Sequence, residues 1–359
     1  METPRPSPHD TLNLFSERNR LHLYSYRAYG LGIESDSFIP GFCPQIPSAP
    51  CDVSLEIGPE PPSWFLKGKP LDSAICYNQP AIPVTADPAY TLTVWGAQRF
   101  FELAYSDGAR FLIDADAKRV WGQCPPLTIE DIGVYLRGPI MGFVLRRRGV
   151  AALHASAVSI SGHSVVMCGP SESGKSTTAA ALALRGVPVH CDDITAVGET
   201  AAGFFVESGY PRICLWPDVV EHLLGAPDIL PRLTPTWGKC FLPLDGIRAT
   251  FEVRRQPLGV VYMFSPRTSE SRAPRVAQLS SRQAVLELVQ NTYLNWLLDR
   301  ERRAAEFDVL TRLVMEVPVR RIIPHSDPHR IGALCDLIRD DAERLTAAPA
   351  RSKMLTSRP

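Results

Sequence analysis

The sequence has no excess of charge of either sign and contains little lysine. Its 38 basic residues balance 38 acidic residues, and only six of the basic residues are lysines. The arginines are scattered, apart from the cluster Arg146-Arg147-Arg148, which fits a solvated helix end. Nothing in this charge distribution draws the whole protein to nucleic acid or to an anionic membrane. We therefore expect neither of them as a partner.

The sequence also lacks the patterns of a disulfide-linked, zinc-binding or membrane-spanning protein. Its nine cysteines are odd in number and widely spaced, with no C-x-x-C pair. No apolar run approaches the thickness of a bilayer, and Met1–Pro6 has no charged-then-apolar signal pattern. We therefore expect buried free thiols and a cytoplasmic protein.

One strong motif is present, the phosphate-binding pattern G-x-x-x-x-G-K-[ST]. A short β-branched run, His163–Cys168, precedes it, and an Ala/Leu-rich segment, Thr177–Arg185, follows it. A strand, a glycine-containing loop and a helix N-terminus in this order direct backbone N–H groups at an anion. The motif therefore predicts that a nucleoside triphosphate binds to a loop made of Gly169, Pro170, Ser171, Glu172, Ser173, Gly174, Lys175, Ser176 and Thr177.

Such a loop needs a metal ion and a carboxylate beside it. Lys175 is expected to contact the β- and γ-phosphates, and Ser176 to place its hydroxyl on Mg²⁺. Asp192 and Asp193 end the next predicted strand, 187–193. Two adjacent carboxylates repel each other, which raises the pKa of one of them. The repulsion would be relieved if one carboxylate bound the metal and the other lay near the acceptor hydroxyl. The alternative is a solvated Asp-Asp turn.

The pattern of strands, turns and helices predicts an α/β protein whose P-loop domain follows a small β domain. The first domain reads as a mainly antiparallel sheet without a catalytic signature. We expect four parts: a disordered segment over 1–20, a β-rich domain over 21–127, a P-loop domain over 128–345 and a flexible tail over 346–359.

Within the second half, a helix capped by Thr128 and Asp131 is predicted to run from 129 to 148 and to join the two domains. Further strands are predicted at 150–160, 212–215, 249–253, 260–264 and 317–323, and helices at 282–298, 301–315 and 328–345.

Several segments resemble a known family. The run His154–Val158 before the loop and the aspartate pair after its helix resemble the catalytic domain of HPr kinase/phosphorylase. The chain is more similar still to the shorter HPr kinase-like proteins, including the lasso-peptide precursor kinases, at Tyr26–Leu31, at Gly209–Ile213 and from Val317 onward. The resemblance implies an HPr kinase-like fold and a kinase that uses ATP and Mg²⁺ to phosphorylate a Ser or Thr hydroxyl of a peptide or protein.

The resemblance also implies roles for single residues. Asp192 matches the family's base for the acceptor hydroxyl, and Asp193 matches its metal-side carboxylate. His154 matches a histidine near the phosphates, although the bare sequence favours a hydrogen-bonded core histidine. Glu207 falls where the family places a further metal-side group, and Arg212 where it places a phosphate-side group.

Two further positions remain open. Lys239, in a Trp-Gly-Lys turn, is either a phosphate contact or a surface lysine. Glu172 stands where close relatives usually carry glycine, and the glycine-rich signature that follows the aspartates in true HPr kinases is missing. HPr itself is therefore not implied as the acceptor, and neither is the reverse phosphorylase activity.

Two rival functions remain beside the peptide or protein kinase. One is a module without transfer activity that binds a peptide or protein under the control of a nucleotide. The other is a kinase for a small metabolite. The sequence leaves the acceptor and a homo-oligomeric state open.

Overall fold

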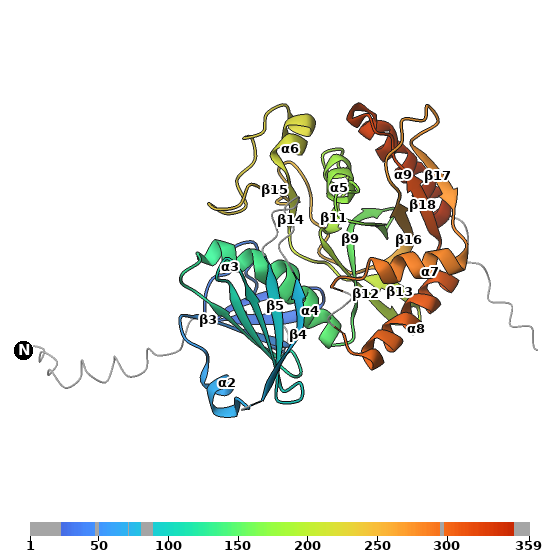
Figure 1. Cartoon of the computed structure of the whole chain (residues 1–359). Coiled ribbons are helices and arrows are strands. Elements are labelled where there is room, and N and C mark those ends of the chain that lie inside the picture. The colour runs from blue at the N-terminus through green and yellow to red at the C-terminus, as the bar shows by residue number, and fades with distance from the viewer. Residues whose placement is uncertain (1–22, 47–49, 71, 80–88, 295–297, 348–359) are drawn as a thin grey trace, which may run out of the picture.

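The structure, a computed structural model, describes residues 23–46, 50–70, 72–79, 89–294 and 298–347. It is a mixed α/β protein with several sheets (Figure 1). The segment 1–20 and the expected tail lie outside the described residues, except that Thr346 and Ala347 belong to the last helix. No helix in the described ranges is both long and apolar enough to cross a membrane.

The first sheet is formed by strands between Tyr24 and Gln123. Among the described residues it has eight strands, in the order β1 (Tyr24–Ala28), β2 (Leu31–Ser35), β3 (Val53–Gly58), β8 (Arg119–Gln123), β7 (Arg110–Asp114), β6 (Phe100–Tyr105), β5 (Tyr90–Trp95) and β4 (Ser73–Gln79). Most neighbours are antiparallel, as the alternating sequence predicts, but β3 lies parallel to both β2 and β8. The short helix α2 (Ser63–Gly68) buries Phe65 against Phe100.

A kinked helix leads from this sheet to the second half (Figure 1). Helix α3 (Ile129–Tyr135) begins with the predicted capping box: the Thr128 hydroxyl accepts from the Asp131 N–H, and the Asp131 carboxylate accepts from the Thr128 N–H. The box satisfies N–H groups that the first helical turn leaves unpaired.

The helix does not continue unbroken to 148, as the sequence predicted. A π-helical turn, η1 (Leu136–Ile140), interrupts it before it resumes as α4 (Met141–Arg147). Within this turn Gly138 leaves the helical region, with φ −98° and ψ −107°, and Pro139 follows it. Proline removes a helical hydrogen bond and clashes with the preceding turn, which accounts for the kink.

The second sheet carries the loop of the phosphate-binding motif. In the described chain its order is β10 (His163–Cys168), β9 (Ala151–Ile160), β12 (Ile194–Thr200), β13 (Gly203–Val206), β16 (Gln256–Phe264), β18 (Val319–Ile323) and β17 (Arg275–Gln278), with β11 (Val189–Cys191) paired to β9. Strand β10 also pairs with β16, and β16 with β18, both in parallel. The carboxyl ends of these three strands therefore lie at one edge, where open α/β sheets bind ligands.

Helices cover both faces of the second sheet. Helices α5 (Lys175–Ala183) and α9 (Ile331–Ala347) pack on one face, and α7 (Ser281–Gln290) and α8 (Arg300–Glu316) pack on the other (Figure 1). Side chains of β10 alternate between the two, so that Val165 faces α5 and Val166 faces α7 and α8. The remaining elements are the hairpin β14 (Arg212–Leu215) and β15 (Cys240–Pro243), the helix α6 (Pro217–Leu224) and the turn η3 (Pro328–Arg330).

One apolar core runs through both halves of the molecule. It includes Phe101 and Phe111 of the first sheet, Phe143 of α4, and Ala152 and Ile194 of the second sheet, all of them buried. The N-terminal sheet is therefore packed onto the rest of the chain through α3 and α4.

Two further predicted elements differ from the structure. The strand expected at 249–253 is reduced to isolated bridges, Asp245 with Thr250 and Phe251 with Val189. The helix expected over 282–298 ends at Gln290, because the chain then turns to strand β9, where the Tyr293 N–H donates to the Ala152 carbonyl over 2.8 Å.

Candidate functional site

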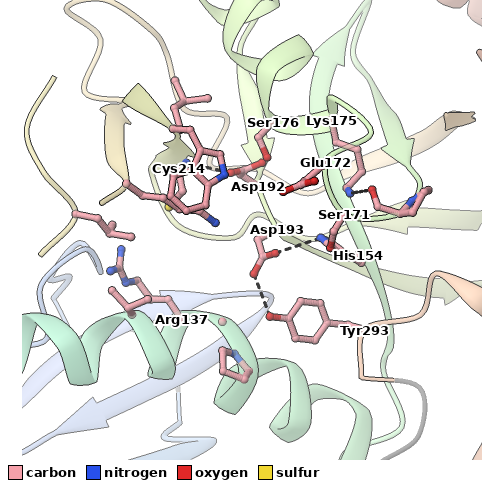
Figure 2. Close-up of a pocket in the computed structure, with 18 of the residues that line it drawn as sticks. Arg137, His154, Ser171, Glu172, Lys175, Ser176, Asp192, Asp193, Cys214 and Tyr293 are labelled. Carbon is pink, nitrogen blue, oxygen red and sulfur yellow. Dashed lines mark hydrogen bonds and ion pairs between the residues drawn. The ribbon is translucent and has the colours of Figure 1, made fainter. Parts of the chain in front are cut away.

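A cavity of about 830 Å³ opens between the carboxyl edge of the second sheet and the kinked helix α3–η1 (Figure 2). Its walls come from both halves of the molecule, including Tyr90 and Tyr105 of the first sheet. The sequence-predicted residues that line it are His154, Pro170, Ser171, Glu172, Gly174, Lys175, Ser176, Thr177, Asp192, Asp193 and Lys239.

Lys175 is held inside the loop at the N-terminus of α5. Only 5% of the residue is exposed, and its ammonium donates to the carbonyls of Gly169 (2.8 Å) and Pro170 (2.9 Å). Burial lowers the pKa of Lys175 below its usual value. The loop thus places one cation beside a helix N-terminus, where the helix dipole also favours an anion.

The loop backbone uses left-handed conformations at two positions. Gly174 caps α5 with φ +102°, a value that suits glycine because it has no Cβ. Glu172 adopts φ +62°, which is uncommon for a residue other than glycine. Its exposed side chain also brings a negative charge to the cavity wall.

Asp192 is buried and hydrogen-bonded on both oxygens. Its Oδ1 accepts from the Ser156 hydroxyl over 2.7 Å, and its Oδ2 accepts from the Cys214 N–H over 3.0 Å. Burial raises the pKa of Asp192, while hydrogen bonds from Ser156 and Ser176 act in the opposite direction. Its contact with Ser176 puts Asp192 beside the hydroxyl that P-loop proteins use for Mg²⁺.

The chain makes a sharp turn between the two aspartates. The Ile194 N–H donates to the Asp192 carbonyl over 2.8 Å, and Asp193 between them has φ +68°. This three-residue γ-turn with a positive φ is rare and strained, even though aspartate tolerates the region better than most residues. Such strain is typically found where function requires a particular geometry.

The turn directs Asp193 into the cavity and away from Asp192. Its side chain is 37% exposed, with Oδ1 3.5 Å from His154 Nε2 and Oδ2 accepting from the Tyr293 hydroxyl over 3.0 Å (Figure 2). Burial and the nearby Asp193 charge raise the pKa of Tyr293 well above its usual value, so that its hydroxyl remains a donor. His154 lies at the cavity wall rather than in the core.

Two arginines at the cavity were not predicted from the sequence. Arg267 lies just after strand β16, and its Nη2 is 3.3 Å from where a Cβ on Gly174 would stand. Arg137, on η1, is 3% exposed, and its Nη1 finds no hydrogen-bond partner among the described residues. Arg137 therefore brings a buried positive charge to the cavity lining, and Arg267 brings an exposed one beside the loop, where positive charge attracts an anionic group.

Three other residues were predicted at the site, and of these Lys239 lines the cavity whereas Arg212 and Glu207 do not. Lys239 lines the cavity with its ammonium 4.9 Å above the Trp216 ring. Arg212 is outside the described lining and stacks over Phe241 at 3.9 Å; burial, and then the charge of Arg137, lower its pKa to about 10. Glu207 packs against Gly30 in the β1–β2 turn and does not line the cavity.

The residues around Ser176 fit Mg²⁺. This ion usually takes one or two carboxylates and completes its shell with water and substrate phosphates. Ser176 with Asp192 provides such a set, and no group of three or more His, Cys, Asp or Glu side chains arranged for a metal occurs within the described ranges. One hydroxyl and one carboxylate leave the rest of the ion's shell to water and phosphate oxygens.

Comparisons with known proteins found a solved structure of low similarity. Neither a family model nor a curated protein matches the chain. A solved structure, the Hpr(Ser) kinase/phosphatase from Coxiella burnetii, is similar with a TM-score of 0.30 and 14% identity over 54% of this chain and 92% of that chain.

The position of Arg267 yields a prediction about nucleotide binding. Because hydrogen bonds to charged groups contribute about 1.5–3 kcal/mol, Arg267→Ala should weaken Mg·ATP binding by roughly 10-fold or more. Calorimetric titration with Mg·ATP measures this. Arg272→Ala, which removes the same charge from the exposed segment after β16, is the control and should bind normally. Equal affinities of the two variants would rule out a phosphate contact for Arg267.

Proposed function

We propose that the protein is a kinase that transfers the γ-phosphoryl group of ATP to a Ser or Thr hydroxyl of a peptide or protein. The observation that carries the proposal is the placement of Asp193. A strained turn exposes this carboxylate in the same cavity as the phosphate-binding loop, while its neighbour Asp192 is buried beside Ser176. We infer that the second half is an HPr kinase-like P-loop domain and that the N-terminal sheet is a separate β domain packed on it.

In this proposal, the chain's own groups position the reactants. The loop amides and Lys175 hold the phosphates of ATP, and Arg267 reaches the same region. Ser176 and Asp192 would hold Mg²⁺, which neutralises phosphate charge when bound. Positioning and charge stabilisation provide most of the catalysis in phosphoryl transfer.

The transfer step itself needs one proton acceptor. The acceptor oxygen forms a bond to the γ-phosphorus as the bond from that phosphorus to the bridging oxygen of the β-phosphate breaks, which releases ADP. The hydroxyl proton passes to the carboxylate of Asp193, which is open to the cavity and oriented by its contacts with His154 and Tyr293.

This division of roles is the reverse of the one that the family resemblance implies. There, Asp192 was expected as the base and Asp193 as the metal-side group. Asp192 has both oxygens engaged by Ser156 and Cys214 and little exposure, which supports the metal side for it. The Asp193 carboxylate is open to the cavity, where an acceptor hydroxyl can reach it, and is therefore the better base.

The strained turn also favours an enzyme over a nucleotide-gated binding module. Binding ATP requires the loop and a metal-side carboxylate, but it gives no reason to hold a second carboxylate in a costly conformation. The aromatic residues Tyr90, Tyr105, Tyr135 and Trp237 on the acceptor-facing walls suit peptide side chains.

The proposal is tested by intact-mass analysis of the acceptor. Full-length protein with Mg·ATP should add one phosphoryl group to a Ser- or Thr-containing peptide acceptor, and a peptide with Ala at that position should stay unmodified. Lys175→Ala protein is the matched control, because the change removes the phosphate-binding cation and should abolish transfer. Phosphorylation of a metabolite instead would support the rival kinase, and Mg·ATP binding without ADP formation in any mixture would support the binding module.

Two aspartate variants test the division of roles. Asp192→Asn should weaken Mg·ATP binding and lower turnover together. Asp193→Asn should leave Mg·ATP affinity nearly unchanged and lower the rate of transfer by roughly 10²–10⁴-fold, the usual contribution of a positioned base. Calorimetric affinities and single-turnover rates measure both. The opposite pattern would restore the assignment implied by the resemblance.

A further inference from the structure

Tyr293 has a closely defined place beside the exposed aspartate. Its hydroxyl donates to Asp193 Oδ2 over 3.0 Å, opposite the contact of Oδ1 with His154 (Figure 2). A carboxylate on a half-exposed turn would otherwise rotate among several staggered conformations. The Tyr293 hydroxyl favours one of them.

Two backbone hydrogen bonds hold Tyr293 in turn. Its N–H donates to the Ala152 carbonyl over 2.8 Å, and its carbonyl accepts from Arg146 Nη1 over 2.8 Å. Arg146 is 2% exposed and is itself fixed by an ion pair with Glu306. The backbone of Tyr293 is thus tied both to strand β9 and to helix α4.

The ring of Tyr293 lies in a socket that only glycine can provide. A Cβ on Gly142 would stand 2.3 Å from Tyr293 Cδ1, far closer than atoms can approach. One helical turn earlier, a Cβ on Gly138 would be 3.5 Å from the Tyr293 hydroxyl oxygen and 3.7 Å from Asp193 Oδ2. The kinked helix η1–α4 is therefore shaped to admit this ring.

We propose that Tyr293 is a positioning residue that fixes the Asp193 carboxylate for proton acceptance, and that Gly142 is the part of the helix that holds Tyr293 in place. The inference rests on the proposed function and extends it to residues outside the loop and the aspartate pair. It also makes the helix that packs on the N-terminal sheet responsible for the geometry of the reacting group.

The test uses full-length protein and the slow hydrolysis of Mg·ATP, in which water takes the place of the acceptor hydroxyl. Tyr293→Phe keeps the ring in the Gly142 socket and removes only the hydroxyl. Because misplacement of a reacting group by about 1 Å can cost 10²-fold, kcat should fall by about 10- to 100-fold. The KM for Mg·ATP should stay unchanged, since it does not depend on the orientation of Asp193. The melting temperature should fall no further than in Tyr262→Phe, which loses a similar hydrogen bond to a carboxylate.

A matched control and a second variant accompany it. Tyr262→Phe makes the same chemical change at a buried tyrosine that donates to Asp341 over 2.8 Å, away from the cavity, and should leave kcat unchanged. Gly142→Ala keeps the Tyr293 hydroxyl but displaces the ring, so it should lower kcat as Tyr293→Phe does. In the double variant the two losses should not add, because both act through one hydrogen bond.

Wild-type kcat in Tyr293→Phe would overturn the inference. So would a parallel loss of kcat, Mg·ATP affinity and melting temperature, which would show a structural role alone. If wild-type protein binds Mg·ATP without hydrolysing it, crystals of Tyr293→Phe decide, and an unmoved Asp193 carboxylate overturns the inference while the proposed function stands. Wild-type protein that binds no Mg·ATP would overturn the proposed function, and the inference with it.

Discussion

The candidate site depends on the turn that separates two adjacent carboxylates. Two aspartates side by side at the end of a strand cannot both lose their hydration without a large electrostatic cost. The γ-turn at Asp193 resolves this, because it buries Asp192 among hydrogen-bond donors and leaves Asp193 exposed. The strain of a positive φ, of the order of 1–3 kcal/mol, is carried by the surrounding sheet. The Ala155 N–H, for example, donates to the Asp193 carbonyl.

The two halves of the molecule contribute unequally to the cavity and share one apolar core. The second sheet provides the loop and both aspartates, whereas the kinked helix contributes Arg137 and Gly138 and the first sheet contributes aromatic side chains. Because one apolar core continues through both halves, a cut before α3 would expose its buried side chains to water. The N-terminal sheet therefore supports the cavity as well as lining it.

The sequence predicted those parts of the structure that depend on residues close together in the chain. The capping box at Thr128 and the loop between β10 and α5 follow from neighbouring residues, and both are present. The mixture of parallel and antiparallel pairs around β3 depends on long-range pairing, which alternation alone does not encode. The loss of the strand at 249–253 has the same origin.

The residues that the sequence missed at the cavity were hidden for specific reasons. Arg267 follows a strand that was predicted, but its relevance appears only when that strand proves to be the parallel neighbour of β10. Arg137 and Tyr293 both fell inside helices predicted to run on without a break. The interruption at Gly138 and the early end of α7 at Gln290 bring them to the cavity.

The central claim is that the loop binds the phosphates of ATP while Asp193 faces the acceptor. A crystal structure with Mg²⁺ and a non-hydrolysable ATP analogue tests it most directly. The account predicts phosphates along the amides of 169–176, the Lys175 ammonium moved from the Gly169 and Pro170 carbonyls onto them, the metal beside Ser176 and Asp192, and Asp193 open beyond the γ-phosphate. A nucleotide bound elsewhere, or Asp193 pointing away from the γ-phosphate, would contradict it.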